Sequence, residues 1–145
     1  MLLAVKSKRA YPFCLERKDG TLMRILIADD ERDLVAALER VMKRTKYEVD
    51  IAYDGIQALE QIHQNQYDCI LLDYMMPRLN GLQVVEKIRK EDNKTPVLFL
   101  TAVSEFDYRQ QAIKNGADAY MSKPFMIRDL LDKVKELTSK GTEQQ

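Results

Sequence analysis

The stretch Met23–Ala28, which reads MRILIA, decides the fold class of this 145-residue chain. Short apolar runs with β-branched residues are typical of strands that are buried on both faces of a sheet. The acidic residues Asp29, Asp30 and Glu31 follow this run at once. Apolar residues then recur every three or four positions over 34–42, so the pattern predicts a buried strand followed by an amphipathic helix.

The same alternation continues along the rest of the chain. Apolar runs predict further strands at 47–52, 68–72, 96–100 and 117–121, and periodic apolar residues predict further helices at 56–62, 79–88, 106–114 and 127–137. Asp54 is expected to cap the helix that follows it. Five strands that alternate with five helices indicate an α/β fold, in which a doubly wound parallel sheet carries helices on both faces.

The composition, with 46% hydrophobic and 32% charged residues, is typical of a single globular domain. No apolar run approaches the ~20 residues that cross a bilayer, and the first residues lack the hydrophobic stretch of a secretory signal. The two cysteines suit neither a disulfide framework nor a metal site. We therefore expect a cytoplasmic protein without membrane contact.

Charge is unevenly distributed in a chain whose formal net charge is zero. Residues 1–22 carry five basic and two acidic side chains, so residues 23–145 carry a net charge of −3. A mildly acidic domain argues against direct nucleic-acid binding, which uses clustered basic residues. Because the first 22 residues show no periodic pattern and Met23 could be the initiating residue, we expect a flexible or artefactual extension at 1–22, one domain at 23–138 and a tail at 139–145.

Polar side chains follow four of the five predicted strands. Asp29 and Asp30 follow the first strand, Asp73 the third, Thr101 the fourth and Lys123 the fifth. The carboxyl ends of parallel strands meet at one edge of a sheet, so these side chains are expected to share that edge. Each of them alone has an ordinary structural explanation, at a helix N-terminus or in a turn. Their common position favours a functional site.

Three crowded carboxylates would destabilise the fold unless a cation neutralised them. A hard divalent ion such as Mg²⁺, which uses one or two carboxylates and keeps several waters, suits this site. Lys123 and Thr101 would add a positive charge and a hydroxyl for an incoming phosphoryl group. Asp73 is the only one of these carboxylates on the central strand, and it is the candidate nucleophile, since aspartate side chains are known to form covalent aspartyl phosphates.

Over residues 23–138 the chain resembles the receiver domain of two-component response regulators. The segments that carry this resemblance are ILIADDE at 25–31, LLDYMMPRLNG at 71–81, LTA at 100–102 and NGADAYMSKPF at 115–125. The resemblance implies a flavodoxin-like (β/α)5 fold with strand order 2-1-3-4-5. It also implies a cis peptide bond between Lys123 and Pro124.

The resemblance implies a role for each site residue. Asp73 would accept a phosphoryl group from a sensor histidine kinase or a histidine phosphotransfer protein. Asp30 and Asp73 would hold Mg²⁺ together with the backbone carbonyl of Met75, and Asp29 would help through a water. The domain would catalyse its own phosphorylation and dephosphorylation and would not otherwise be an enzyme.

We also expect a switch that transmits the phosphorylation signal. Thr101 and Lys123 would contact the phosphoryl oxygens, and Tyr120 would turn into the space that Thr101 leaves. The surface of the last two helices, 106–114 and 127–137, would then control a downstream effector protein. The expected protein is a monomer or weak dimer, and the short tail implies either a stand-alone receiver or one cut at a linker.

Three other functions agree with parts of this sequence. A phosphohydrolase of the haloacid dehalogenase type also uses an Asp nucleophile and Mg²⁺, but it has a second acid where this chain has Met75. A nucleotide-binding module would need a Gly-rich loop after the first strand, where residues 29–32 are charged. A degenerate receiver would bind partners without phosphorylation, and the complete set of acidic residues and Lys123 argues against it.

Overall fold

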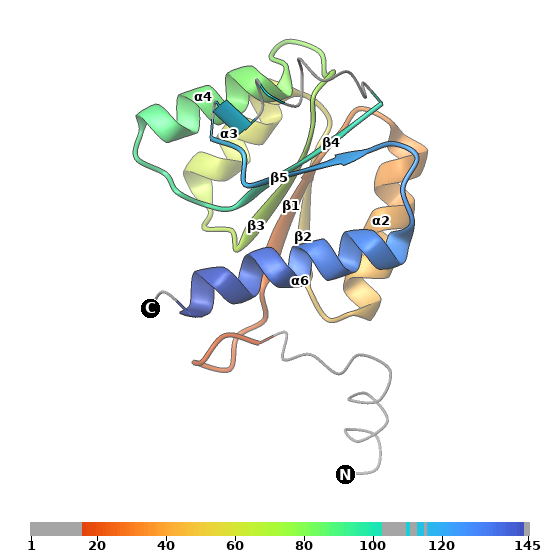
Figure 1. Ribbon diagram of the computed structural model, residues 1–145, viewed down its shortest axis with the longest axis vertical. Coiled ribbons are helices and arrows are strands. Elements are labelled where there is room, and N and C mark those ends of the chain that lie inside the picture. Colours follow the sequence, from red (N-terminus) through yellow and green to blue (C-terminus); the bar gives the residue numbers. More distant parts are fainter. Residues whose placement is uncertain (1–15, 103–109, 111–112, 115, 144–145) are drawn as a thin grey trace.

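The strands form one parallel sheet with helices on both sides (Figure 1). The computed structural model describes residues 16–102, 110, 113–114 and 116–143. In chain order the elements are β1 (Arg24–Ala28), α2 (Arg32–Arg44), β2 (Glu48–Ala52), α3 (Gly55–Gln64), β3 (Cys69–Asp73), α4 (Gly81–Lys90), β4 (Val97–Thr101), β5 (Ala119–Ser122) and α6 (Ile127–Glu143). The five predicted strands are all present, with limits that differ by one or two residues.

The strand order is β2-β1-β3-β4-β5, and every neighbouring pair is parallel, which confirms the predicted topology. β3 and β4 are buried at every residue because helices cover both of their faces. The carboxyl ends of all five strands point to one edge of the sheet, as the parallel pairing requires. The candidate site residues therefore share that edge.

The two faces of the sheet carry separate apolar cores. On one face α3 and α4 pack against the strands, and Ile88 of α4 belongs to the same cluster as Ile70. On the other face α2 and α6 contribute Leu38 and Val134 to a cluster with Leu71. Neighbouring residues of β3 serve opposite cores because side chains alternate along a strand.

The start of α4 differs from the prediction by two residues, because Asn80 rather than Leu79 marks its beginning. The Asn80 side chain accepts a hydrogen bond from the backbone N–H of Gln83 at 2.9 Å, and the Gln83 side chain accepts one from the backbone N–H of Asn80 at 2.9 Å. This reciprocal capping box sets the helix start. Gly81 is required at the first position, because a Cβ there would collide with the backbone oxygen of Asp73.

Residues 16–22, which we predicted to be part of a flexible extension, fold against the amino-end edge of the sheet. Arg17 donates two hydrogen bonds to the Asp68 carboxylate, at 3.2 and 2.6 Å. Asp68 also accepts a hydrogen bond from the backbone N–H of Arg24 at 2.7 Å. The structure therefore differs from the prediction at 16–22, whereas residues 1–15 lie outside the described residues.

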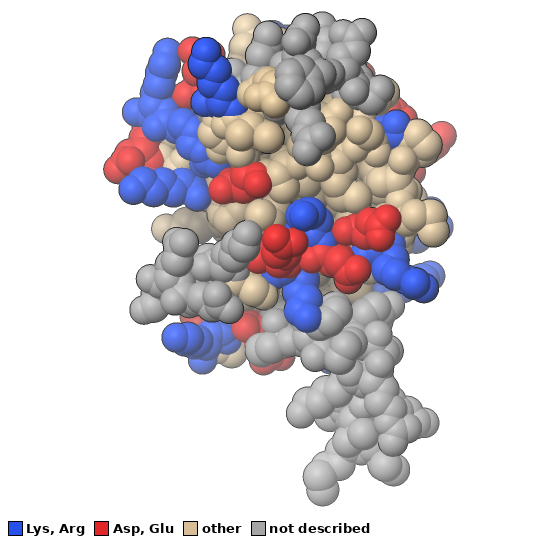
Figure 2. Space-filling view, viewed as in Figure 1, with Lys and Arg blue, Asp and Glu red and all other residues tan. Residues whose placement is uncertain are grey.

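The predicted helix at 106–114 lies largely outside the described residues, and so do residues 144–145. Residues 139–143, which we predicted to be part of a tail, belong to α6, because that helix continues to Glu143. Within the described part of the chain, no helix is long and apolar enough to cross a membrane. Figure 2 shows side chains of both charge signs over α6 and a largely uncharged area over the neighbouring strands. The visible face of α6 is therefore of mixed charge rather than strongly basic or acidic.

Candidate functional site

Three carboxylates meet at the edge of the sheet where β1 and β3 end. Asp29 and Asp30 follow β1, and Asp73 is the last residue of the neighbouring β3. One carboxylate oxygen from each residue lies within 4.8 Å of the other two. Asp29 and Asp73 are only 2% and 5% exposed, whereas Asp30 is exposed. Like charges at this separation repel one another, so the cluster favours a bound cation.

The Asp29 carboxylate is fixed at both of its oxygens. Oδ1 accepts a hydrogen bond from the backbone N–H of Glu31 at 2.9 Å, and Oδ2 accepts one from the Lys123 ammonium at 2.6 Å. The backbone N–H of Asp29 donates to the carbonyl of Ala52 at 3.1 Å. Asp29 is therefore a rigid neighbour of Asp73, with less freedom to bind a ligand directly than the exposed Asp30.

Lys123, which follows β5, is surrounded by carboxylates. Its Nζ lies 2.6 Å from Asp29, 3.0 Å from Glu31 and 3.5 Å from Asp73. Burial, the largest single cause, would lower the pKa of this ammonium, but its hydrogen bonds to Asp29 and Glu31 and the negative charges of Asp73 and Asp29 together outweigh burial, and the pKa is raised. Lys123 therefore stays charged at neutral pH. The peptide bond between Lys123 and Pro124 is cis, which confirms that expectation.

The pKa of the Asp73 carboxyl is raised to about 7. Burial is the largest cause and repulsion from Asp29 is the next, while Lys123 acts in the opposite direction. Near neutral pH, without a cation, the carboxyl is divided between its protonated and ionised forms. A divalent cation bound beside it would favour the ionised form, which is the nucleophilic one.

Thr101 and Tyr120 lie on the strands beyond β3. Thr101 ends β4 and is 2% exposed, and its carbonyl accepts a hydrogen bond from the backbone N–H of Lys123 at 2.7 Å. Tyr120 lies in β5, partly buried against the core formed with α3 and α4, and its hydroxyl accepts a hydrogen bond from Ser122 Oγ at 3.2 Å. Thr101 and Lys123 are thus joined through the backbone. The movement of Tyr120 stays a prediction.

The residues at this edge suit a hard divalent cation. Mg²⁺ prefers carboxylate oxygens and keeps several waters. The buried Asp73 and the exposed Asp30 offer oxygens of this kind, with Asp30 open to solvent. The backbone carbonyl of Met75 stays a predicted ligand, and the Met75 side chain is 60% exposed.

Glu31 also lies at this edge, although the sequence pattern predicted no role for it. It is the N-cap residue of α2, and its Oε1 lies 3.0 Å from Lys123 Nζ. Its place as a third acid directly after Asp29 and Asp30 is the signal that could have identified it. Its partner Lys123 is 92 positions further along the chain, so the contact becomes visible only in the folded domain.

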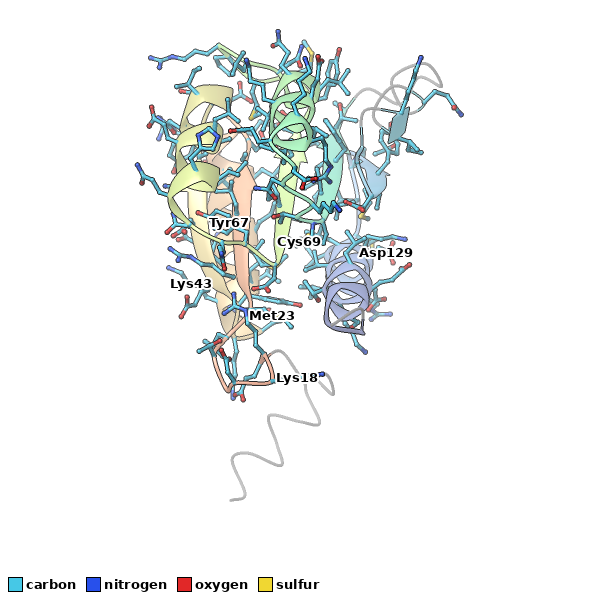
Figure 3. All side chains as sticks on the ribbon, turned by 90° about the vertical axis from the view of Figure 1, so that its left-hand side faces the viewer. Lys18, Met23, Lys43, Tyr67, Cys69 and Asp129 are labelled. Atoms are coloured by element: carbon cyan, nitrogen blue, oxygen red, sulfur yellow. The ribbon has the colours of Figure 1, made fainter. Side chains whose placement is uncertain are left out.

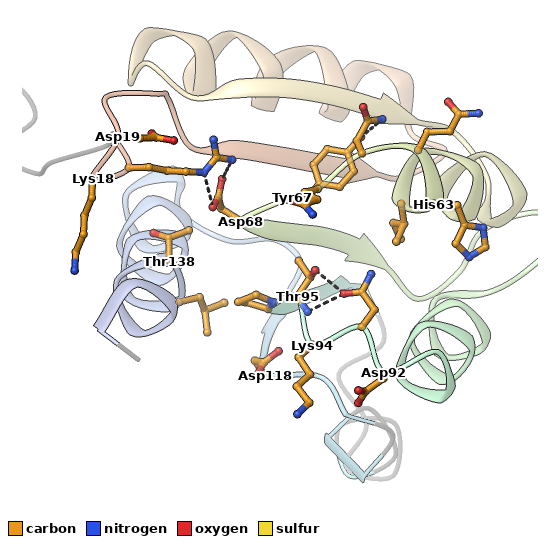
Figure 4. A pocket seen from close by; sticks show the side chains of 18 residues that line it. Lys18, Asp19, His63, Tyr67, Asp68, Asp92, Lys94, Thr95, Asp118 and Thr138 are labelled. Atoms are coloured by element: carbon orange, nitrogen blue, oxygen red, sulfur yellow. Dashed lines mark hydrogen bonds and ion pairs between the residues drawn. The ribbon is translucent and has the colours of Figure 1, made fainter. Parts of the chain in front are cut away.

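A hollow of about 1260 Å³ lies at the opposite edge of the sheet. Figure 4 shows Asp68, Lys94 and Asp118 around it, with Asp68 hydrogen-bonded to Arg17. Figure 3 shows the labelled Lys18 at the same end of the molecule, where the amino ends of the strands lie. Asp68 and Asp118, two of the four carboxylates that line this hollow, are each paired with an arginine, whereas Asp29, Glu31 and Asp73 at the carboxyl-end edge share Lys123.

Known sequences include close relatives of this chain. Residues 25–135 match the family model of the response regulator receiver domain. The transcriptional regulatory protein PrrA of Mycobacterium tuberculosis is 42% identical over 117 residues, a match that covers 81% of this chain and 50% of PrrA. The response regulator MprA of Mycobacterium avium is 39% identical over 115 residues, covering 79% of this chain and 50% of MprA. The chain thus spans about half the length of the curated relatives it matches.

Solved structures agree with these sequence matches. A CheY-like response regulator receiver domain protein from Methanospirillum hungatei is 29% identical, with a TM-score of 0.83 and coverage of 86% of this chain and 100% of that one. The response regulator TrrA of Thermotoga maritima, solved in complex with Mg²⁺-BeF, is 34% identical, with a TM-score of 0.73 and coverage of 80% and 99%. The chain therefore belongs to the response regulator receiver domain family, the phosphorylation-controlled switches of two-component signalling.

Proposed function

We propose that this domain accepts a phosphoryl group on Asp73 from a phosphohistidine of a sensor histidine kinase or a histidine phosphotransfer protein. The observation that carries the proposal is the placement of Asp73 within 4.8 Å of two other carboxylates and 3.5 Å from the Lys123 ammonium. Such a site neutralises and positions a phosphoryl group, which is most of what phosphoryl transfer requires.

The transfer exchanges one bond to phosphorus for another. A carboxylate oxygen of Asp73 attacks phosphorus, the N–P bond of phosphohistidine breaks, and the imidazole keeps the electron pair of that bond. Lys123 is positioned to pair with the phosphoryl oxygens, because its Nζ already lies 3.5 Å from Asp73 Oδ1. Later attack of water on phosphorus would release inorganic phosphate and restore the carboxylate.

Asp30, Asp73 and the backbone carbonyl of Met75 are the proposed ligands of Mg²⁺, with Asp29 beside them. When bound, Mg²⁺ would neutralise the charge that builds up on the phosphoryl oxygens and stabilise the ionised form of Asp73. The complex of TrrA with Mg²⁺-BeF supports this choice of metal, because TrrA has the same fold and 34% sequence identity.

The proposed output begins at Thr101 and Lys123. Thr101 ends β4, which lies next to β3, and Lys123 follows β5, which lies next to β4. A backbone hydrogen bond of 2.7 Å joins the two residues. A phosphoryl group on Asp73 would draw the Thr101 hydroxyl inward, and Tyr120 on the adjacent strand would follow. An effector protein would read the resulting surface around β5 and the last two helices.

The proposal includes no enzyme activity beyond the domain's own phosphorylation and dephosphorylation. PrrA is described as a transcriptional regulatory protein, and about half of its length has no counterpart in the match. The prediction of no direct nucleic-acid contact is therefore confined to the domain at 23–138. A cytoplasmic location and a monomeric or weakly dimeric state also stay predictions.

Intact-mass measurement after incubation with acetyl phosphate and Mg²⁺ tests the phosphoacceptor. The wild-type domain should gain the mass of one phosphoryl group, and Asp73→Asn should gain none. Asp132→Asn on the exposed surface of α6 is the matched control, and it should be labelled like the wild type. Full labelling of Asp73→Asn would show that another residue is the phosphoacceptor.

A further inference from the structure

The Lys123 ammonium contacts three carboxylates at unequal distances. An ammonium has three N–H donors. The two shorter contacts are with Asp29 at 2.6 Å and Glu31 at 3.0 Å, and the contact with Asp73 is the longest at 3.5 Å. Lys123 is therefore bound more closely to Asp29 and Glu31 than to the proposed phosphoacceptor.

The N-terminus of α2 offers a second, independent observation about Glu31. The N-cap residues of α3 and α4, Asp54 and Asn80, each accept a hydrogen bond from the backbone N–H of the third helical residue. Glu31 is the N-cap of α2, and its side chain makes no capping hydrogen bond. The Glu31 carboxylate accepts a hydrogen bond from Lys123 instead, and Glu is not among the residues that favour the N-cap position.

The two partners differ in their exposure to solvent. The Glu31 side chain is 60% exposed, whereas the Asp29 side chain is 2% exposed and fixed at both oxygens. An exposed ion pair is weak, and it can be exchanged at low cost. Of the two close contacts of Lys123, the one with Glu31 is thus the one that can be released when a stronger anion arrives.

We propose that Glu31 is a positioning residue for Lys123, an inference that rests on the proposed function of the site. In the unphosphorylated domain Glu31 holds the ammonium away from Asp73. A phosphoryl group on Asp73 competes with Glu31 for the same ammonium, and the contact with Glu31 is the one that phosphorylation weakens. The Glu31 carboxylate stabilises the unphosphorylated state relative to the phosphorylated one.

Titration with beryllofluoride, a phosphoryl mimic, at saturating Mg²⁺ and followed by amide NMR, tests this proposal. Glu31→Gln should lower the half-saturating concentration about two- to fivefold, the range expected for an exposed ion pair. The matched control is Glu39→Gln, which removes the same charge from α2 by breaking the partly exposed pair of Glu39 with Lys43. It should leave the half-saturating concentration unchanged.

Two further measurements separate positioning from a change in helix stability. Without beryllofluoride, the side-chain resonances of Lys123 should shift in Glu31→Gln and not in Glu39→Gln. Glu31→Ser supplies a good N-cap, so it should raise the melting temperature. It should nevertheless tighten beryllofluoride binding as much as Glu31→Gln does.

The outcomes distinguish this inference from the proposed function. If the wild type binds no beryllofluoride, the proposed function is wrong, and the Lys123 resonances still decide whether Glu31 holds the ammonium. If the wild type binds and Glu31→Gln binds equally well or more weakly, Glu31 does not compete for Lys123 and the positioning role is overturned. Unchanged Lys123 resonances in Glu31→Gln would overturn it as well.

Discussion

The two edges of the sheet differ in how far their carboxylates are neutralised by basic side chains. At the amino-end edge each of three carboxylates is paired with its own guanidinium: Arg17 with Asp68 at 2.6 Å, Arg24 with Asp50 at 2.7 Å and Arg89 with Asp118 at 3.1 Å. At the carboxyl-end edge Asp29, Glu31 and Asp73 share the single ammonium of Lys123, and Asp30 lies beside them.

This difference indicates that the two edges have different roles, one structural and one in ligand binding. Paired charges at the amino-end edge hold residue 17 and the start of β3 in place. Excess negative charge at the carboxyl-end edge destabilises the domain without a ligand, and that same charge makes a cation favourable. The raised pKa of Asp73 is the measurable sign of the difference.

The largest expected effect is the pH dependence of stability without metal. The pKa of Asp73 is about 7 in the folded domain, against 3.8 for an ordinary Asp. The unfolded chain therefore loses its proton first as the pH rises, and the free energy of unfolding falls between about pH 4 and pH 7, by on the order of 3 kcal/mol. Urea unfolding in EDTA at pH 5.5 and pH 8 should show a decrease for the wild type.

The variant Asp73→Asn removes this titrating group. Its free energy of unfolding at pH 8 should exceed that of the wild type, and most of the decrease from pH 5.5 to pH 8 should disappear. Asp132→Asn on the surface of α6 should retain the wild-type decrease. A decrease of the same size in Asp73→Asn would place the titrating group elsewhere.

The next effect belongs to the amino-end edge. Arg17→Gln should lower the free energy of unfolding by about 2 kcal/mol, because a two-fold hydrogen-bonded charge pair with a partly buried Asp68 is lost. Lys18→Gln changes the same charge at the neighbouring position and should have an effect within about 0.5 kcal/mol. If urea and thermal unfolding show that Arg17→Gln and Lys18→Gln lower the free energy of unfolding by the same amount, Arg17 does not anchor residues 16–22.

The strands and the position of the candidate site were predictable from the sequence, because the residues that form a strand and the residue that follows it are neighbours in the chain. The apolar runs before Asp29, Asp73 and Thr101 fix three strands, and the parallel order brings the ends of these strands together. The cap of α3 at Asp54 was predictable for the same reason, since capping involves neighbours in the sequence.

The pairings of charge could not be predicted in this way. Arg17 and Asp68 are 51 positions apart, and Glu31 and Lys123 are 92 apart. Hydrophobic periodicity places elements, but it does not determine which carboxylate a long cationic side chain will contact. The start of α4 differed for another reason, because Leu79 fits the apolar pattern of the helix although Asn80 caps it.

A smaller effect should follow from the metal. Mg²⁺ at ten times its Kd should add about 1.4 kcal/mol to the free energy of unfolding, because it binds the folded state only. Asp30→Asn should lose most of this gain, whereas the surface variant Asp132→Asn should keep it. Differential scanning calorimetry with Mg²⁺ or EDTA provides the measurement. No gain in the wild type at any Mg²⁺ concentration would argue against a cation site.

The smallest expected effect is the stability of Asp30→Asn relative to the wild type without metal, and its sign is opposite to that expected with Mg²⁺. Without metal, Asp30→Asn should be more stable than the wild type by about 0.5 kcal/mol, because one like charge beside Asp29 and Asp73 is removed. Asp30 is exposed, so salt screens this repulsion, and the difference should shrink in 1 M NaCl, where the Debye length is about 3 Å. The same variant is thus expected to be more stable than the wild type in EDTA and less stable at saturating Mg²⁺. A general defect in folding would lower stability in both conditions, so the reversal itself, measured by urea unfolding, separates a charged cation site from an acidic residue that serves only the fold.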